Sequence, residues 1–543
     1  MKSLLITGLL IAALPQTSRA DGLPAPRLIV AISVDQFSAD LFEEYRPLFT
    51  AGLRRLATGA VFPSGYQSHS ATETCPGHST ILTGSHPART GIIANDWIDE
   101  SIARADKTVY CAEDPGVPGT SSRDYSASVQ YLKAQTLGDR VKASSPGSRV
   151  VSVAGKDRAA LMLGGHQTDQ VWFWSKGAFT TLAGRTGDRP AAVDRINRET
   201  AAEVARPSRP PLPDVCRAHS IAIPVGNRAV GTLDQPPPKG ALAFQTSLAF
   251  DRATTELAIG LIRELRLGQS AAVDVLTVGL SATDYVGHAF GTEGAEMCAQ
   301  LLGVDQNVGR ILEALDATHQ PYLVVLTADH GGHDLPERNR LRGIPDAVRA
   351  DPALLPSSLG KAIAQEFGLK EAVILGNGPS GDFYLARSVP ADLRARVLES
   401  ARARLLAHPQ VAAVFTATEL RRLAAPAGPV DEWSLADRFR ANFDPDRSGD
   451  LLVALKPHVT GMISTETYVA THGSPWNYDR RVPILFFRPG VAGFEQPLPV
   501  ETVDILPTIA AQIGLSIPAG EIDGRCIDLG FQPAARCPVA SRP

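Results

Sequence analysis

The chain has 543 residues, of which 44% are hydrophobic, 20% charged and 6% aromatic. These proportions supply enough apolar side chains for a large core and exclude a disordered or fibrous protein. The formal net charge of −4 gives no reason to expect binding to nucleic acid, beyond nucleotide substrates, or to an anionic membrane.

The N-terminus, residues 1–20, has the features of a secretory signal peptide. Lys2 provides a positive start, Leu4–Leu14 is a short apolar stretch, and Ser18–Ala20 offers small residues for cleavage. The apolar stretch is too short to span a bilayer comfortably, which disfavours an uncleaved anchor. We therefore expect a mature chain that begins at Asp21, has no membrane span, and is periplasmic or secreted.

Short apolar runs rich in β-branched residues alternate with stretches of helical spacing along the rest of the chain. The predicted strands are Arg27–Val34, Val273–Leu280, Tyr322–Thr327 and Val482–Phe487. The predicted helices are Asp40–Phe49, Ser247–Leu267, Ala295–Ala317 and Val500–Ile513. This alternation predicts an α/β fold with a doubly wound, mostly parallel central sheet and helices on both faces.

Two regions interrupt the alternation. Residues 100–245 are rich in Gly, Pro and Ser, whereas residues 340–450 contain a helical stretch at Ala391–Leu406 and a strand-like segment at Asp382–Ala386. We interpret both as insertions into one domain that spans residues 21–543.

Two short motifs resemble ligand-binding loops. Gly376–Gly381 matches the dinucleotide pattern GxGxxG, but Pro379 lies inside it and a strand-like segment follows, so no helix N-terminus is available for a pyrophosphate. Asp444–Gly449 begins like a calcium loop, but Leu455 stands where a bidentate glutamate is needed. Both are interpreted as turns.

The chain has six cysteines, and export would permit disulfides. Cys526 and Cys537 are close in sequence and are the best candidates for one bridge. Cys111 and Cys216 lie in segments rich in Pro and Gly and could form another, whereas Cys298 lies in a helical stretch and could be a buried thiol. Spacing alone does not determine the pairing.

Carboxylates and histidines recur where the predicted strands end or in the loops beside them. The candidates are Asp35, Asp284, His288, Asp329, His330 and His472. Each one alone could be a turn residue, a helix cap or a satisfied polar group, but open α/β sheets place their sites at the carboxyl ends of strands. Mixed oxygen and nitrogen ligands suit zinc, and six of them are enough for two ions.

Thr74 precedes Pro76, which suits the first turn of a helix and places Thr74 at or just before its N-terminus. The free N–H groups and positive dipole end there favour an anionic phosphoryl group. A metal ion could lower the pKa of the hydroxyl and make it a nucleophile. Considered by itself, however, Thr74 is better explained as a helix cap.

Taken as a set, these motifs resemble the alkaline phosphatase superfamily, and most closely the phosphate-irrepressible bacterial alkaline phosphatases that use threonine. In the expected order along the chain they are Asp35, T-C-P-G-H-S-T at 74–80, Asn95-Asp96-Trp97, Asp284-x-x-x-His288, Asp329-His330-Gly331-Gly332 and Thr471-His472-Gly473.

The resemblance implies two zinc sites and a covalent mechanism. The ligands of one ion would be Asp284, His288 and His472, and those of the other Asp35, Asp329, His330 and the Oγ of Thr74. Two such ions hold the attacking and leaving oxygens of an in-line displacement. Thr74 would form a phosphothreonine, and water activated by the other zinc ion would hydrolyse it.

The resemblance also assigns phosphate-binding roles to Lys156, Arg158 and Asn95. Lys156 and Arg158 follow the strand-like segment Arg149–Val153 and would bind non-bridging phosphate oxygens as a point charge and a planar fork. Without the resemblance they would be a charged turn, and Asn95 an ordinary turn residue.

These features lead us to expect a zinc-dependent phosphate monoester hydrolase with a broad range of small phosphate-ester substrates. The alternative is a phosphodiesterase or nucleotide pyrophosphatase of the same superfamily. A sulfatase is disfavoured because Pro76 follows Cys75 directly and the modification motif C/S-x-P-x-R is missing. A phosphoethanolamine transferase would need membrane helices. A non-catalytic zinc protein would not need Thr74 or the phosphate-binding group. The oligomeric state stays open, with a monomer as the working expectation.

Overall fold

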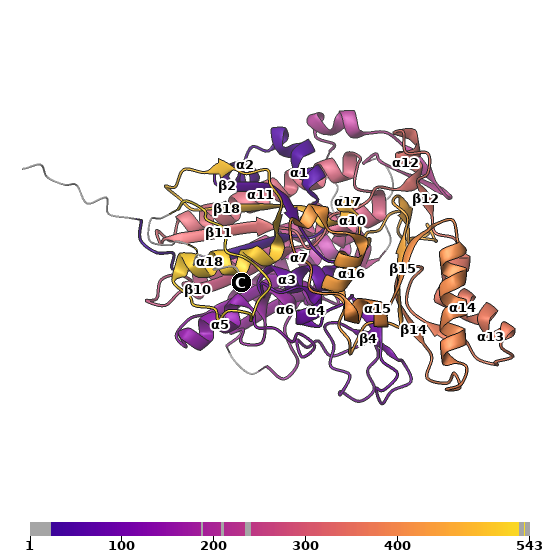
Figure 1. Cartoon of the computed structure of the whole chain (residues 1–543). Helices are drawn as coiled ribbons and strands as arrows, with labels where there is room; N and C mark the ends of the chain where they lie inside the picture. Colours follow the sequence, from indigo (N-terminus) through magenta and orange to yellow (C-terminus); the bar gives the residue numbers. More distant parts are fainter. Residues whose placement is uncertain (1–22, 186–187, 208–210, 234–239, 532–536, 538–543) are drawn as a thin grey trace, which may run out of the picture.

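The computed structural model describes residues 23–543 except 186–187, 208–210, 234–239, 532–536 and 538–543 (Figure 1). The expected signal peptide and mature start at Asp21 therefore lie outside the described residues. Among the helices that are described, none combines the length and apolar character that a membrane crossing requires.

A ten-stranded sheet forms the centre of the molecule, in the order β19-β2-β18-β11-β1-β10-β5-β6-β7 with β20 beside β2. The pairs from β11 to β6 are parallel, whereas β18 runs antiparallel to both neighbours and β7 runs antiparallel to β6. The prediction of a mostly parallel sheet is confirmed. The strands are β1 (Leu28–Val34), β2 (Ala60–Tyr66), β5 (Val150–Ala154), β6 (Gln170–Ser175), β7 (Ala178–Thr180), β10 (Asp274–Leu280), β11 (Tyr322–Thr327), β18 (Arg481–Phe487), β19 (Phe494–Glu495) and β20 (Val500–Glu501).

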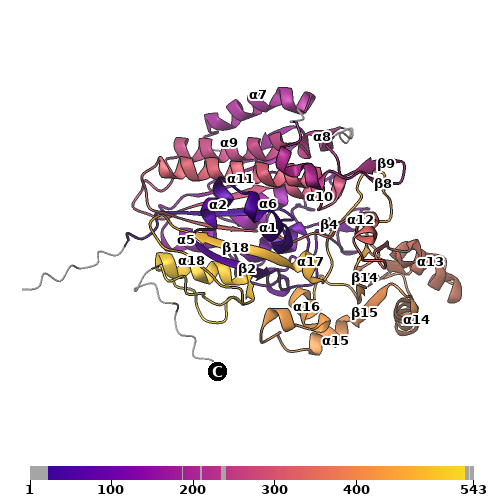
Figure 2. The same ribbon diagram turned by 90° about the horizontal axis from the view of Figure 1, so that it is seen from above.

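Helices cover both faces of this sheet, as predicted, and Figure 2 shows α9 and α11 on one side and α18 on the other. Successive side chains of a strand point to opposite faces. In β1, Val30 and Ile32 accordingly belong to the core under α9 and α11, whereas Ile29 and Ala31 belong to the core under α18. One layer contains α1 (Ala39–Tyr45), α2 (Gly52–Leu56), α7 (Ala191–Ala205), α9 (Leu248–Glu264), α10 (Ala282–Phe290) and α11 (Ala295–Asp316); the other contains α3 (Thr74–Ile81), α5 (Leu137–Ser144), α6 (Asp157–Gly164) and α18 (Ile505–Ile513).

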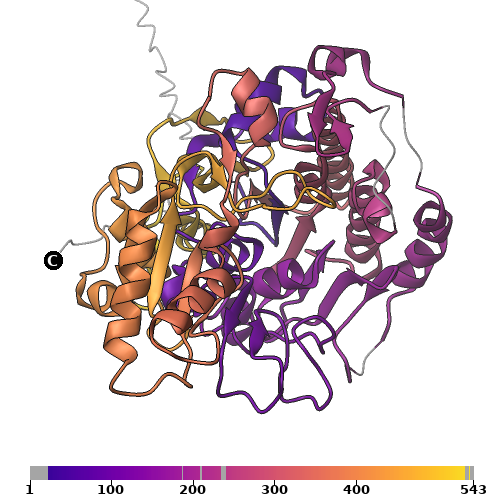
Figure 3. The same cartoon turned by 90° about the vertical axis from the view of Figure 1, so that its right-hand side faces the viewer.

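A smaller antiparallel sheet lies beside the central one, in the order β13-β14-β16-β15. It is formed by the segment expected as the second insertion, 340–450, and by β16 just after it. The helices α13 and α14 pack on its outer side (Figure 1), and Figure 3 views the molecule from this side, with these orange segments next to the purple N-terminal half. The elements are β13 (Ile374–Leu375), β14 (Gly381–Leu385), β15 (Val411–Thr416), β16 (Leu451–Leu455), α13 (Pro356–Glu366) and α14 (Arg394–Ala407).

The first expected insertion, residues 100–245, is corrected by the structure. Its middle part contributes β5, β6 and β7 to the central sheet, and α5 and α6 cover that part of the sheet. The sequence VVSVA of β5 is fully buried, which is typical of a parallel strand. The strand-like segment Arg149–Val153 corresponds to β5, but the loops rich in Gly, Pro and Ser around it favoured an insertion for the region as a whole.

The two motifs interpreted as turns are turns. Gly376–Gly381 connects β13 to β14, and Gly376 and Gly381 have positive φ angles of 156° and 81°. Asp444–Gly449 leads into β16, and the Oδ2 of Asp444 accepts a hydrogen bond from Lys133 at 2.6 Å.

The disulfides differ from expectation in one respect. Cys526 and Cys537 are paired as predicted, but the suggested bridge between Cys111 and Cys216 is wrong. Cys111 is bonded to Cys75 on α3, and Cys216 is bonded to Cys298, which lies on α11 and is not a free thiol. These pairs are 36 and 82 residues apart, so each depends on a tertiary contact that sequence proximity does not indicate.

Candidate active site

The candidate site lies at the carboxyl edge of the central sheet. Asp35 follows β1, Asp329 follows β11 after one residue, Lys156 follows β5, and Asp284 lies in the first turn of α10 after β10. Because β11, β1, β10 and β5 are adjacent and parallel, their carboxyl ends meet at one edge. The folding of these strands therefore brings together residues that are up to 294 positions apart in the sequence.

One cluster contains Asp284, His288 and His472. The two histidines each place Nε2 at 3.3 Å from the same Oδ1 of Asp284. Their Nδ1 atoms lie 2.9 Å from the carbonyl oxygen of Ala470 and 2.7 Å from that of Thr72, respectively. A backbone carbonyl accepts from Nδ1–H, so both rings keep the Nε2 lone pair for a metal ion.

A second cluster contains Asp35, His78 and Asp329, and His330 contacts it through Asp329. His330 repeats the same arrangement, with Nδ1 at 2.8 Å from the carbonyl oxygen of Gly331 and Nε2 at 3.3 Å from Oδ2 of Asp329. Burial lowers the pKa of His330, but the neighbouring Asp329 outweighs it and raises the value to about 9. The rings of His330 and His472 stack with centroids 3.6 Å apart, so the two clusters are contiguous.

His78 is the member of this second cluster that is not among the candidate ligands predicted from the sequence. It lies one helical turn after Thr74 on α3, with Nε2 at 3.4 Å from Asp35 and Nδ1 at 3.3 Å from Asp329. Nδ1 is also 2.8 Å from the carbonyl oxygen of Thr74. The i, i+4 spacing of Thr74 and His78 in the TCPGH segment was the signal that could have identified it.

The two clusters fit metal ions better than they fit ordinary hydrogen bonding. Several of their buried atoms take part in ion pairs at most and have no hydrogen-bond partner among the described residues: both Asp35 carboxylate oxygens, Thr74 Oγ1, His78 Nε2, Asp284 Oδ1, Asp329 Oδ2 and His330 Nε2. Ligands of a tetrahedral zinc ion at about 2.0–2.1 Å lie about 3.3–3.4 Å from each other. The N···O separations of 3.3 Å within both clusters match this edge length.

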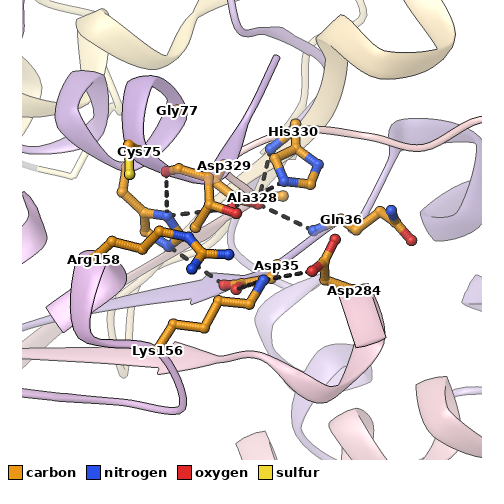
Figure 4. Close-up of polar contacts among 12 residues, drawn as sticks. Asp35, Gln36, Cys75, Gly77, Lys156, Arg158, Asp284, Ala328, Asp329 and His330 are labelled. Carbon is orange, nitrogen blue, oxygen red and sulfur yellow. Dashed lines mark hydrogen bonds and ion pairs between the residues drawn. The ribbon is translucent and has the colours of Figure 1, made fainter. Parts of the chain in front are cut away.

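Lys156 lies between the two clusters (Figure 4). Its Nζ is 2.5 Å from Oδ2 of Asp284 and 3.0 Å from Oδ2 of Asp35, and the side chain is buried. Burial opposes the charge, but the two carboxylates raise the pKa of Lys156 above its usual range. The same contact, together with His288, lowers the pKa of Asp284 well below its usual range despite burial. The lysine is therefore a fixed positive charge at the centre of the site.

Thr74 is the first residue of α3, which confirms its expected position. The residue before it, Glu73, is the N-cap, so the interpretation of Thr74 itself as the cap is wrong. Gly77 lets this helix approach β11, since a Cβ atom there would lie 1.9 Å from the carbonyl oxygen of Asp329. Thr74 is thereby held at the positive end of the helix, and its backbone carbonyl contacts His78 of the second cluster.

Asn95 is hydrogen-bonded to the start of α3. Its Oδ1 accepts from the backbone N–H of Cys75 at 2.8 Å, and its own backbone N–H donates to Oε2 of Glu73 at 2.6 Å. The Nδ2 amino group is the donor that remains for a ligand. The disulfide between Cys75 and Cys111 fixes the same turn to the strand pair β3 (Asp96–Ile98) and β4 (Thr108–Tyr110).

Arg158 lies in the first turn of α6, two residues after Lys156. Its Nη1 is 3.4 Å from the hydroxyl of Tyr110, and its Nε has no hydrogen-bond partner in the described part of the chain. Asp157 accepts hydrogen bonds from Tyr110 and Tyr125 at 2.8 and 2.6 Å, which orders this turn. Figure 4 shows the side chains of Arg158 and Lys156 side by side.

Comparison with known proteins gives consistent results. The family model of type I phosphodiesterase / nucleotide pyrophosphatase matches residues 29–475. The chain is 53% identical to alkaline phosphatase PhoD of Zymomonas mobilis subsp. mobilis, over 94% of this chain and 90% of that protein. It is 52% identical to alkaline phosphatase PhoK of a Sphingomonas species, over 93% and 91%.

Solved structures of alkaline phosphatase PafA have the same fold. The wild-type enzyme superimposes with a TM-score of 0.80 at 26% identity, covering 93% of this chain and 99% of that one. A variant of that enzyme with one threonine, one asparagine, one lysine and one arginine replaced gives a TM-score of 0.79 at 25% identity, with the same coverage.

Proposed function

The chain belongs to the type I phosphodiesterase / nucleotide pyrophosphatase family of the alkaline phosphatase superfamily and is an alkaline phosphatase, and we propose that it hydrolyses phosphate monoesters with two zinc ions through a phosphothreonine on Thr74. The observation that carries this proposal is the pair of clusters at the sheet edge, in which Nε2 atoms and carboxylate oxygens lie 3.3 Å apart and the second cluster contacts Thr74 through His78.

Each ion would have three protein ligands from one cluster. The first would be held by Asp284, His288 and His472, and the second by Asp35, Asp329 and His330 together with the Oγ of Thr74. Zinc at these places would neutralise the phosphate and lower the pKa values of the threonine hydroxyl and of water, which favours activity at alkaline pH. The donor set supports zinc because imidazole nitrogen and carboxylate oxygen are its usual ligands.

The residues of the chain itself would bind and orient the ester. Thr74 at the N-terminus of α3 attacks phosphorus, and the ester oxygen leaves on the opposite side. Lys156, Arg158 and the Nδ2 of Asn95 donate to the non-bridging oxygens, whose negative charge grows in the transition state. The positive end of α3 favours the phosphoryl group in the same way. Water then releases phosphate from Thr74.

The monoester assignment depends on the two cations Lys156 and Arg158, because a monoester dianion carries one more negative charge than a diester. The alternative, a phosphodiesterase, is favoured by the description of the matching family. The test is kcat/KM for an aryl phosphate and for its methyl diester. We expect a preference for the monoester, and a preference for the diester would contradict the proposal.

The disulfides among the described residues indicate an extracytoplasmic protein, because such bonds persist in oxidising compartments. Residues 1–20 are proposed to be a cleaved signal peptide that directs the chain to the periplasm or the medium. We further propose a monomeric enzyme with a single domain, residues 21–543, in which the smaller sheet is an insertion.

A further inference from the structure

A cavity of about 340 Å³ opens beside the candidate metal ligands. It is lined by His288, His472 and Asn95, by β14 and β16 of the smaller sheet, and by residues 377–381. The cavity therefore lies between the carboxyl edge of the central sheet and the smaller sheet, and residues of both contribute to its wall.

Apart from histidines, the ionisable side chains that the structure describes around this cavity are all acids. Burial raises their pKa values, to about 7 for Asp96, Asp382 and Asp479, so the cavity is most negative at alkaline pH. Four carboxylates line it, those of Glu73, Asp96, Asp382 and Asp479, and none of the described lining residues is a lysine or arginine. This composition is unexpected beside a site for anionic phosphate. A cavity that only needed to attract phosphate would not be lined by four acids.

Two residues that line the cavity each have a buried acceptor oxygen with no hydrogen-bond partner within the described structure. Asp479 is 1% exposed, and while its Oδ2 accepts from Ser474, its Oδ1 is unpaired. Asn442 is also 1% exposed; its Nδ2 donates to the carbonyl oxygen of Ile93, and its Oδ1 is unpaired. Buried acceptors of this kind are normally satisfied, so the cavity favours a ligand that brings hydrogen-bond donors.

The in-line geometry of the proposed function determines which part of a substrate enters the cavity. Thr74 is beside Asp35, Asp329 and His330, so the ester oxygen would leave on the side of Asp284, His288 and His472. His288 and His472 line the cavity. The alcohol part of the ester thus extends from the metal centre into the space bounded by the carboxylates.

We infer that this cavity binds the alcohol part of the substrate and selects phosphate monoesters whose alcohol carries a primary ammonium group. Such a group supplies three donors and a positive charge to a cavity that offers acceptors and negative charge. The inference rests on the proposed monoesterase function and names the substrate class that the enzyme favours among monoesters.

The test is a comparison of isosteric substrates at pH 8. Values of kcat/KM are measured for 2-aminoethyl and 4-aminobutyl phosphate and for propyl and pentyl phosphate, in which a methyl group replaces the ammonium. We expect kcat/KM for the better of the two amine substrates to be about tenfold higher than for its alkyl counterpart, which is the effect of one charge-assisted contact. Equal values, or a preference for the alkyl esters at both lengths, would overturn the inference.

Two variants locate the effect. Asp382→Asn removes a carboxylate from the cavity wall, and we expect it to reduce the amine-to-alkyl ratio severalfold. Asp124→Asn removes an acid that is 85% exposed and lies outside the cavity, and the ratio should stay as in the wild type. A ratio unaffected by Asp382→Asn would contradict the role of the cavity. If instead no monoester is hydrolysed, or a methyl diester is preferred, the proposed function itself fails.

Discussion

Lys156 illustrates how the roles of single residues depend on their contacts. In sequence it is one charge in a turn after a strand, whereas in the structure its Nζ contacts the carboxylates of both candidate metal clusters. The proposed substrate dianion would bind beside this charge and beside Arg158, so both cations should contribute more to monoester than to diester turnover.

We predict that Lys156→Ala and Arg158→Ala each lower kcat/KM for an aryl phosphate by about 100-fold, which corresponds to the loss of one strong charge-assisted hydrogen bond. The loss for the methyl diester should be much smaller. Lys361→Ala, an exposed lysine on α13, serves as the matched control and should change neither value. Equal losses on both substrates in the two site variants would count against a monoesterase.

His78 is the residue whose proposed role comes from the structure alone. It contacts Asp35 and Asp329, two of the proposed ligands, and hydrogen-bonds to the carbonyl of Thr74. Groups that orient metal ligands typically contribute 10- to 100-fold to metal affinity.

We predict that His78→Asn, which keeps a donor near Nδ1 but removes Nε2, weakens zinc binding by about tenfold. Chelator competition with the purified enzyme measures this affinity. The exposed His319, changed to Asn, is the control and should retain the wild-type value. If both variants hold zinc equally well, His78 has no part in positioning the ligands.

At the scale of elements, α4 (Pro87–Thr90) is joined to β20 by an ionic contact with a pH-dependent strength. Nε2 of His86, the residue before α4, is 3.0 Å from Oε2 of Glu501 on β20. Burial lowers the pKa of His86, but the hydrogen bond to Glu501 has the larger effect, and the net result is a raised pKa. Burial raises the pKa of Glu501, but the same contact outweighs it and lowers that pKa.

Because the pKa of His86 is higher in the folded than in the unfolded protein, its protonated form stabilises the fold. This stabilisation is complete below the unfolded pKa of about 6.5 and is lost as the pH rises through the folded pKa. The ionised form of Glu501, whose pKa is lowered, stabilises the fold at pH values above its unfolded pKa of about 4.3. We predict that the difference in Tm between the wild type and His86→Gln is largest at about pH 5 to 6.5 and decreases toward pH 9. A difference that grows toward alkaline pH would refute this assignment.

The elements that the sequence predicted well are those with continuous apolar runs or long helical periods. Tyr322–Thr327 coincides with β11, and Val273–Leu280 differs from β10 by one residue. The predicted helix Val500–Ile513 is shorter in the structure, because its first residues form β20 and a 3-10 turn. The strand-like segment Arg149–Val153 corresponds to β5, but β5 to β7 were assigned to an insertion because loop-rich sequence surrounds these short strands.

At the scale of the whole molecule, the fold explains why the candidate ligands could be predicted from sequence. Except for His472, which lies in the loop before β18, they follow strands that proved to be adjacent and parallel, so local sequence placed them at one edge of the sheet. The contacts of His78, the pairing of Cys216 with Cys298 and the acidic cavity could not be predicted in the same way. They depend on the packing of segments that are distant in sequence and have no recognisable spacing.

The central claim is that Thr74 is the nucleophile of a two-zinc centre, and the variant Thr74→Ala tests it most directly. We predict that this variant retains two zinc ions per chain and a Tm near that of the wild type, while turnover of an aryl phosphate falls by about 10³-fold or more. Thr74→Ser keeps a hydroxyl and should retain substantial turnover, and acid-quenched wild-type enzyme should carry phosphate on Thr74. Turnover of Thr74→Ala close to that of the wild type, with zinc bound, would contradict the account.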